Sequence, residues 1–146
     1  MRPSEVFMAA RDAVMEMAKI DEKIFELSEH IGVMGHSYDR KPKNDIKDPS
    51  RKVDEMLDGT MELEREKREC QRSVDEAMRL IIGLNAIDEL AAYVVMEHYV
   101  RLRHDWQIAR GIGTNEAVAK KFRKTILEEC DKIGYTKLRM GAFDDS

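Results

Sequence analysis

The sequence contains few of the residues that cross-link small secreted domains, break helices or fill β-sheets. Of its 146 residues, two are cysteine, three are proline and 6% are aromatic. The cysteines, Cys70 and Cys130, have no C-x-x-C spacing, so we expect small apolar residues without a redox or metal role. Ten methionines and few aromatic residues favour helices over sheets, because unbranched side chains lose little freedom in a helix.

Long hydrophobic runs are also missing. The longest apolar stretch, 81–100, is interrupted by Asn85, Asp88 and Glu89, whereas a membrane helix needs about 18 apolar residues. The first ten residues lack the basic and apolar regions of a secretory signal. With 37% charged and 42% hydrophobic residues, the composition predicts a folded, soluble, cytoplasmic protein without a membrane partner.

Apolar residues near the N-terminus recur in alternating steps of four and three, which is the spacing of a coiled-coil seam. They are Val6, Ala10, Ala13, Met17, Ile20, Ile24, Leu27 and Ile31. Ser4 is the expected N-cap of this helix and Gly32 its expected end, which gives about 27 residues, or roughly 40 Å. Residues 32–48, which contain Gly35, Pro42 and a mixed-charge run, are expected to form a connecting loop.

A second long helix is predicted to begin at Pro49, because Asp48 followed by proline is a favourable helix start. Its seam includes two polar members and consists of Val53, Met56, Thr60, Leu63, Lys67, Cys70, Val74, Ala77, Ile81 and Leu84. At about 36 residues, this helix would exceed the first by about 14 Å. Either the C-terminal segment or a second chain must cover the excess. We therefore predict that residues 1–84 form a coiled-coil hairpin that assembles into a homodimer or higher homo-oligomer.

The remaining segment, 85–146, is predicted to be a small bundle of shorter helices. We expect Asn85 to cap a helix that ends near Arg101. His98 lies on or beside its apolar face and is expected to be a core or edge residue rather than a ligand. The tail, 134–146, has enough apolar residues to dock in part.

A helix-turn-helix is predicted within this segment. Asp105 is expected to cap its first helix and Thr114 its second, which ends near Ile133. Ala109 is small enough for two helices to cross, and Gly113, four residues later, permits the positive φ of the turn. The apolar face of the second helix is expected to consist of Val118, Ala119, Phe122, Ile126 and Ile133.

Positive charge gathers around this motif. The chain has a formal net charge of -4 and a pI of about 5.6, yet residues 101–124 hold seven basic and two acidic residues. A basic segment in an acidic protein predicts an anionic partner, and beside a helix-turn-helix the expected partner is double-stranded DNA. Asn115, Glu116 and Ala117 are expected nearest the base edges, whereas Lys120 and Lys124 lie on the outer side, from which they can reach bases or phosphates. The full predicted set is Arg110, Thr114, Asn115, Glu116, Lys120, Lys121, Arg123 and Lys124.

The chain also resembles a known family over roughly residues 7–133. The matching elements are a long first helix, a polar loop, Asp54 in a long second helix that ends with Ala77-Met78-Arg79-Leu80-Ile81-Ile82-Gly83-Leu84, and the segments Tyr99-Val100, Trp106-Gln107-Ile108-Ala109, Ile112-Gly113 and Thr125-Ile126-Leu127. In these features the sequence is similar to the phage-encoded ArpU and RinA-type transcriptional regulators, whose C-terminus resembles region four of bacterial sigma factors. The resemblance implies phage or prophage DNA binding in transcription regulation, with RNA polymerase as a further candidate partner.

The sequence lacks the residue spacing of a nucleotide-binding loop or of a metal site. A dinucleotide-binding loop at Gly111-Ile112-Gly113 would need glycine where Glu116 stands, and the four histidines are not spaced as metal ligands. We predict no catalytic residue, no metal, no cofactor and no enzymatic activity. Two alternatives to a DNA-binding regulator stay open. One is a phage DNA-packaging accessory that resembles a small terminase subunit, and the other is a helical adaptor that does not bind nucleic acid.

Overall fold

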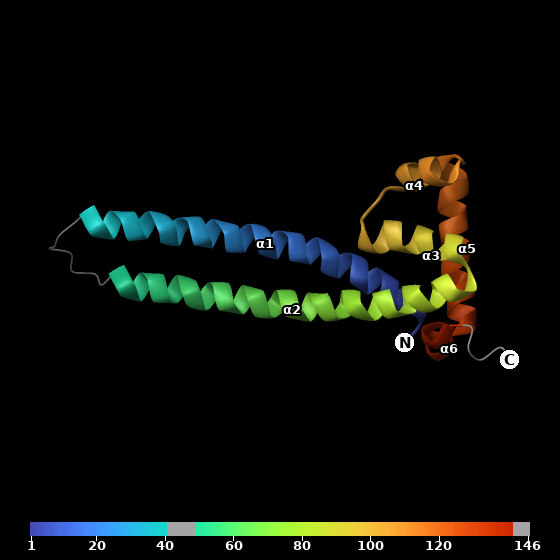
Figure 1. Ribbon diagram of the computed structural model, residues 1–146, viewed down its shortest axis with the longest axis horizontal. Coiled ribbons are helices and arrows are strands. Elements are labelled where there is room, and N and C mark those ends of the chain that lie inside the picture. The colour runs from blue at the N-terminus through green and yellow to red at the C-terminus, as the bar shows by residue number, and fades with distance from the viewer. Residues whose placement is uncertain (41–48, 142–146) are drawn as a thin grey trace. The chain divides into compact units, whose positions relative to one another are not determined.

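The computed structural model describes the backbone of residues 1–40 and 49–141, with side chains at 1–29 and 53–141. Within these ranges the chain is helical and has no strand, which confirms the predicted all-α class (Figure 1). A π-helical segment, η1, interrupts the α-helices. The elements in chain order are α1 (Pro3–Arg40), α2 (Pro49–Ile87), α3 (Glu89–Val95), η1 (Met96–Val100), α4 (Asp105–Ile112), α5 (Glu116–Ile133) and α6 (Tyr135–Met140).

The chain divides into two compact units. The first, which we call the hairpin unit, consists of residues 16–69. The second, the core unit, combines residues 1–15 with residues 70–146. Both α1 and α2 therefore contribute to both units. These bounds differ from the division that the sequence predicts, into residues 1–84 and 85–146.

In the hairpin unit, α1 and α2 run side by side in opposite directions (Figure 1). Asp21 forms an ion pair of 2.6 Å with Nζ of Lys67, and the side chain of Leu27 lies 3.9 Å from the position of a Cβ atom at Gly59. These two contacts fix an antiparallel register. Among the described apolar side chains of this unit, only Ile20 is fully buried, so the unit has a thin core.

The first helix continues past Gly32 to Arg40, so the predicted helix end is wrong. A glycine inside a helix costs only about 1 kcal/mol, which a long helix tolerates. As a result α1 and α2, with 38 and 39 residues, are nearly equal in length. The expected 14 Å excess, roughly nine helical residues and our reason for predicting self-association, does not exist. Residues 41–48, the rest of the predicted loop 32–48, lie outside the described residues.

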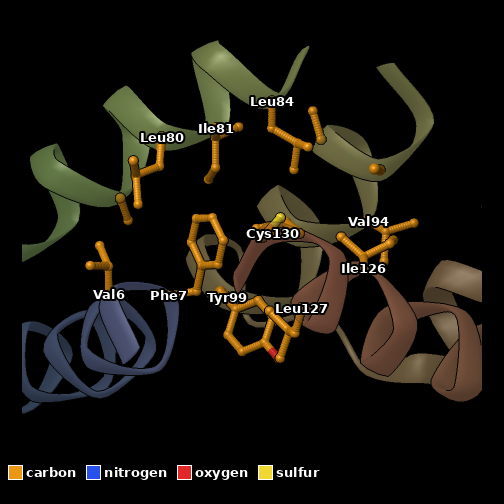
Figure 2. Close-up of a cluster of buried hydrophobic side chains, with 14 of the residues drawn as sticks. Val6, Phe7, Leu80, Ile81, Leu84, Val94, Tyr99, Ile126, Leu127 and Cys130 are labelled. Atoms are coloured by element: carbon orange, nitrogen blue, oxygen red, sulfur yellow. The ribbon is translucent and has the colours of Figure 1, made fainter. Parts of the chain in front are cut away.

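The core unit is built on one apolar cluster, whose side chains come from α1, α2, α3, η1, α4, α5 and α6. Figure 2 shows part of it. Phe7 is fully buried, and its ring centroid lies 6.1 Å from that of Tyr99. Leu80 and Leu84, at the end of the α2 seam, are buried in the same cluster. The C-terminal helices and the start of α1 therefore cover this part of the seam. Cys130 is also buried here, and burial raises the pKa of its thiol to about 12.

The last helix, α6, packs closely on the end of α2. Leu138 is fully buried, and its carbonyl oxygen occupies the space in which a Cβ atom at Gly83 would lie. Only glycine allows the two backbones to approach so closely. The prediction that the tail docks in part is therefore confirmed as far as Met140.

The caps predicted for the first helix and for the helix that follows α2 are both wrong. Ser4 lies inside α1, where its backbone N and its Oγ donate to the carboxylate of Asp131 at 2.8 and 2.7 Å. Further along, α2 continues past Asn85, and Asp88 caps α3 by accepting a hydrogen bond of 3.2 Å from the backbone N of Ala91. Neighbouring polar residues have similar capping ability, so the cap is decided by where the preceding helix ends.

Candidate nucleic-acid interface

The turn between α4 and α5 has the backbone geometry that the sequence predicts. Gly113 ends α4 in the left-handed region, with φ 75° and ψ 36°, and the backbone N of Thr114 donates to the carbonyl of Ala109 at 2.9 Å. Ala109 and Ala119 are buried, which lets the two helices pack closely. Gly111, in contrast, lies within α4. The corner is therefore a compact helix-turn-helix.

The start of α5 is capped by Asn115 rather than by Thr114. The Oδ1 atom of Asn115 accepts a hydrogen bond of 2.9 Å from the backbone N of Val118, and Glu116 follows in the first helical turn. The amide oxygen of Asn115 thus stabilises the helix, although the sequence predicts a role at the base edges. Val118, expected on the apolar face, is instead 50% exposed because it lies in the first turn, beside the chain reversal.

A largely buried ion pair holds α4 against α5. Asp105, the first residue of α4 and not its cap, accepts hydrogen bonds of 2.9 and 3.1 Å from Nε and Nη2 of Arg123, and both side chains are 13% exposed. Arg123 also donates to the hydroxyl of Tyr99 at 3.1 Å. The hydrogen bonds from Arg123 lower the pKa of Asp105 below its usual range. Arg123, predicted to contact DNA, is therefore engaged inside the protein.

His98 is held in its neutral form beside this ion pair. Its Nδ1 lies 3.1 Å from the carbonyl of Arg103, and its Nε2 lies 3.2 Å from Nη1 of Arg11. A carbonyl only accepts and a guanidinium only donates, so the ring carries its proton on Nδ1. Burial, followed by the charges of Arg123 and Arg11, lowers its pKa to about 4. The expectation of a core or edge residue is confirmed.

Two further cations of the basic segment are paired with a carboxylate. Glu97 is buried in η1 and lies 3.2 Å from Nη1 of Arg101 and 3.5 Å from Nε of Arg103. The backbone turns immediately afterwards at Leu102, which has a positive φ of 57°. A leucine in this conformation costs about 1 kcal/mol, so local packing must offset the strain. Arg101 and Arg103 thus stabilise the connection between η1 and α4 through their ion pairs with Glu97.

Four predicted DNA ligands remain exposed and form no ion pair with any described residue: Arg110, Lys120, Lys121 and Lys124. Arg110 projects from α4 and lies 5.7 Å above the ring of Trp106, which is 48% exposed. The three lysines project from α5, and Lys124 follows Lys120 by one helical turn. Thr114 is half-buried and Glu116 is exposed at the start of α5. The corner therefore carries four exposed cations that form no ion pair within the described part of the chain.

Sequence reasoning missed Arg11 as part of this region. Arg11 comes from α1, and its Nη1 donates to the carbonyl of His98 at 2.9 Å, across 87 positions of sequence. The spacing of apolar residues gives no sign of such a contact. Within the described part of the chain, no group of three metal-ligating side chains comes together, and no helix is long and apolar enough to span a membrane.

No family model, curated protein or solved structure matches this chain. Geometry and charge at the corner between α4 and α5 are therefore the basis for assigning a function.

Proposed function

We propose that the protein binds duplex DNA through the corner of α4 and α5, with α5 in the major groove. The observation that carries the proposal is the set of exposed cations, Arg110, Lys120, Lys121 and Lys124, around a turn braced by the Asp105–Arg123 ion pair. A rigid corner fixes the direction of the second helix, and outward cations bind phosphates. The protein is, in this proposal, a DNA-binding regulator without enzymatic activity.

The acidic pI of about 5.6 does not oppose this function. Electrostatic attraction between exposed charges falls off within about 10 Å at 0.1 M salt, so DNA responds to the local surface rather than to the total charge. Because Arg101, Arg103 and Arg123 have internal carboxylate partners, the attraction is expected to come from Arg110 and the lysines of α5.

The resemblance to ArpU and RinA-type regulators supplies the proposed setting, which is transcription regulation in a phage or prophage, inside the cytoplasm, with RNA polymerase as a further partner. A helix-turn-helix that reads two half-sites requires two copies of the protein. We therefore include a homodimer or higher homo-oligomer in the proposal.

The test is equilibrium binding of the full chain to a random-sequence duplex, followed by fluorescence anisotropy. Lys120→Ala with Lys124→Ala should weaken binding at least about tenfold at low salt, since each lost phosphate contact removes counterion release. The matched control is Lys19→Ala with Lys23→Ala, which removes two exposed cations at the same spacing from α1. Absence of binding at low salt, or equal losses in both double variants, would overturn the proposal in favour of an adaptor without nucleic-acid binding.

A further inference from the structure

Trp106 is the only tryptophan of the chain, and it is 48% exposed. Tryptophan is highly buried on average in folded proteins, because its large ring system stabilises a core. Trp106 lies in the first turn of α4, whereas the buried side chains of this helix are Ile108 and Ala109. About half of Trp106 is therefore open to a partner.

The guanidinium group of Arg110 lies over the ring of Trp106. Arg110 follows Trp106 by one helical turn, and its Cζ lies 5.7 Å from the ring centroid. A cation is attracted to an aromatic face within roughly 6 Å. Arg110 is exposed and forms no ion pair with any described residue. The ring of Trp106 therefore favours one orientation of an otherwise exposed side chain.

Trp106 and Arg110 lie on an open stripe of α4 that leads to the turn. Positions 106, 110 and 113 follow one another in steps of four and three, so they share one side of the helix. Gly113 ends the stripe, and apart from its chain neighbours and its own helix no described atom lies within 4 Å of the position of a Cβ atom there. The stripe is therefore open up to the corner at which we propose that DNA binds.

A stacked guanidinium group keeps its hydrogen-bond donors free. The attraction to the ring uses the flat face of the group, whereas its N–H donors point outward from the edges. A phosphate group can therefore accept two parallel hydrogen bonds from an arginine that is already stacked. An arginine without such a contact loses more rotamer entropy when it binds, so the stack lowers the free-energy cost of a phosphate contact.

We propose that Trp106 is a positioning residue for DNA binding, which holds Arg110 in the orientation that binds a phosphate. In a helix-turn-helix, the first helix crosses the sugar–phosphate backbone while the second lies in the major groove. A contact from α4 is therefore a phosphate contact without base preference. This inference rests on the proposed function and deepens it, because it assigns α4 its own contact with the DNA.

A purely structural role of the same pair predicts a different result. Arg110 lies in the last turn of α4, where a cation stabilises the helix dipole, and side chains four residues apart stabilise a helix. In that case, removal of the ring would lower the melting temperature without a specific effect on DNA binding. A positioning role changes DNA binding at temperatures where every variant is folded, and only when Arg110 is present.

The test is fluorescence anisotropy of a labelled random-sequence duplex with the full chain at low salt. Trp106→Leu keeps an apolar, helix-compatible side chain without a ring, and Trp106→Phe keeps an aromatic face. Arg110→Ala is measured alone and together with Trp106→Leu. The matched control is Phe25→Leu, which replaces an exposed aromatic residue of the hairpin unit. Circular dichroism and thermal unfolding check that each variant is folded.

We expect Trp106→Leu to weaken binding about threefold, which is the size of an exposed cation–π interaction, while Trp106→Phe and Phe25→Leu stay within about 1.5-fold of the wild type. In the Arg110→Ala background, Trp106→Leu should cause no further loss of affinity. The slope of log K against log salt should decrease by about 0.9 in Arg110→Ala, which lacks one phosphate contact, and should stay unchanged in Trp106→Leu.

The proposal is overturned if Trp106→Leu or Arg110→Ala binds like the wild type, or if Trp106→Phe loses as much affinity as Trp106→Leu. An equal loss for Trp106→Leu in the Arg110→Ala background would also overturn it, because the ring would then act without Arg110. Failure of the proposed function is recognised separately: the wild type would not bind the duplex, or Lys120→Ala with Lys124→Ala would bind like the wild type. Absence of wild-type binding would overturn this inference as well.

Discussion

The core unit and the hairpin unit are built from the same two long helices, yet they bury side chains to very different extents. In the core unit, Phe7, Leu80 and Leu138 are fully buried. In the described part of the hairpin unit, only Ile20 reaches that state. The ion pairs differ in the same way, since Asp105 and Arg123 are each 13% exposed, whereas Lys67 and Asp21 are 42% and 56% exposed.

This difference shows what a heptad pattern does and does not predict. The pattern places apolar residues on one stripe of each helix, and it does so equally in both units. Burial depends on how many other elements cover that stripe. The core unit adds the shorter helices to the ends of α1 and α2, whereas the described residues of the hairpin unit belong to α1 and α2 alone.

The largest expected contrast is between two phenylalanines of α1. Phe7→Ala should destabilise the chain by about 4 kcal/mol, because it empties a fully buried site. Phe25→Ala should change stability by less than about 0.5 kcal/mol at concentrations where the chain is monomeric, because the ring is exposed. Urea unfolding followed by circular dichroism measures both. Similar losses for the two variants would contradict the proposed difference between the units.

The two ion pairs give the next contrast. Arg123→Met should cost about 3 kcal/mol, because it leaves the Asp105 carboxylate without its partner in a nearly buried position. Lys67→Met should be neutral within about 0.5 kcal/mol or stabilising, because its pair is exposed and the residue occupies a seam position. Thermal unfolding of both variants provides the measurement. A larger loss of stability for Lys67→Met than for Arg123→Met would contradict the proposed difference between the two ion pairs.

Protonation of His98 at acid pH should destabilise the core unit. Its pKa is about 4 in the fold, below the ordinary value of 6.5, so the unfolded chain binds the extra proton in this window. The contribution of neutral His98 to the free energy of unfolding is fully present above pH 6.5 and is lost as the pH falls toward 4. At pH 5 the loss is about 2 kcal/mol. His98→Gln should reduce the difference in unfolding midpoint between pH 7 and pH 5. An unchanged difference would show that other groups cause the acid sensitivity.

Local signals in the sequence were sufficient for much of the fold. Proline after Asp48 marked the start of α2, Gly113 marked the turn, and the end of α5 at Ile133 was predicted correctly. Helix ends and caps were less predictable. Gly32 costs too little to stop a long helix, and neighbouring polar residues compete as caps with similar energies.

The candidate site was predictable only in part, for a physical reason. Charge and spacing identified the exposed lysines of α5, but they could not distinguish Arg123, whose carboxylate partner lies across the turn. The contacts of Arg11 with His98 and of Ser4 with Asp131 join segments 87 and 127 positions apart. Such pairs form only after the helices pack, so no local pattern indicates them.

The most direct test of the account is the salt dependence of DNA binding. We predict that log K falls linearly with log salt for the wild type, by about 0.9 for each phosphate contacted. Lys120→Ala with Lys124→Ala should flatten the slope by nearly 2, while Lys19→Ala with Lys23→Ala in the hairpin unit should leave it unchanged. An identical slope in all three proteins would contradict the assignment of α5 as the DNA-binding helix.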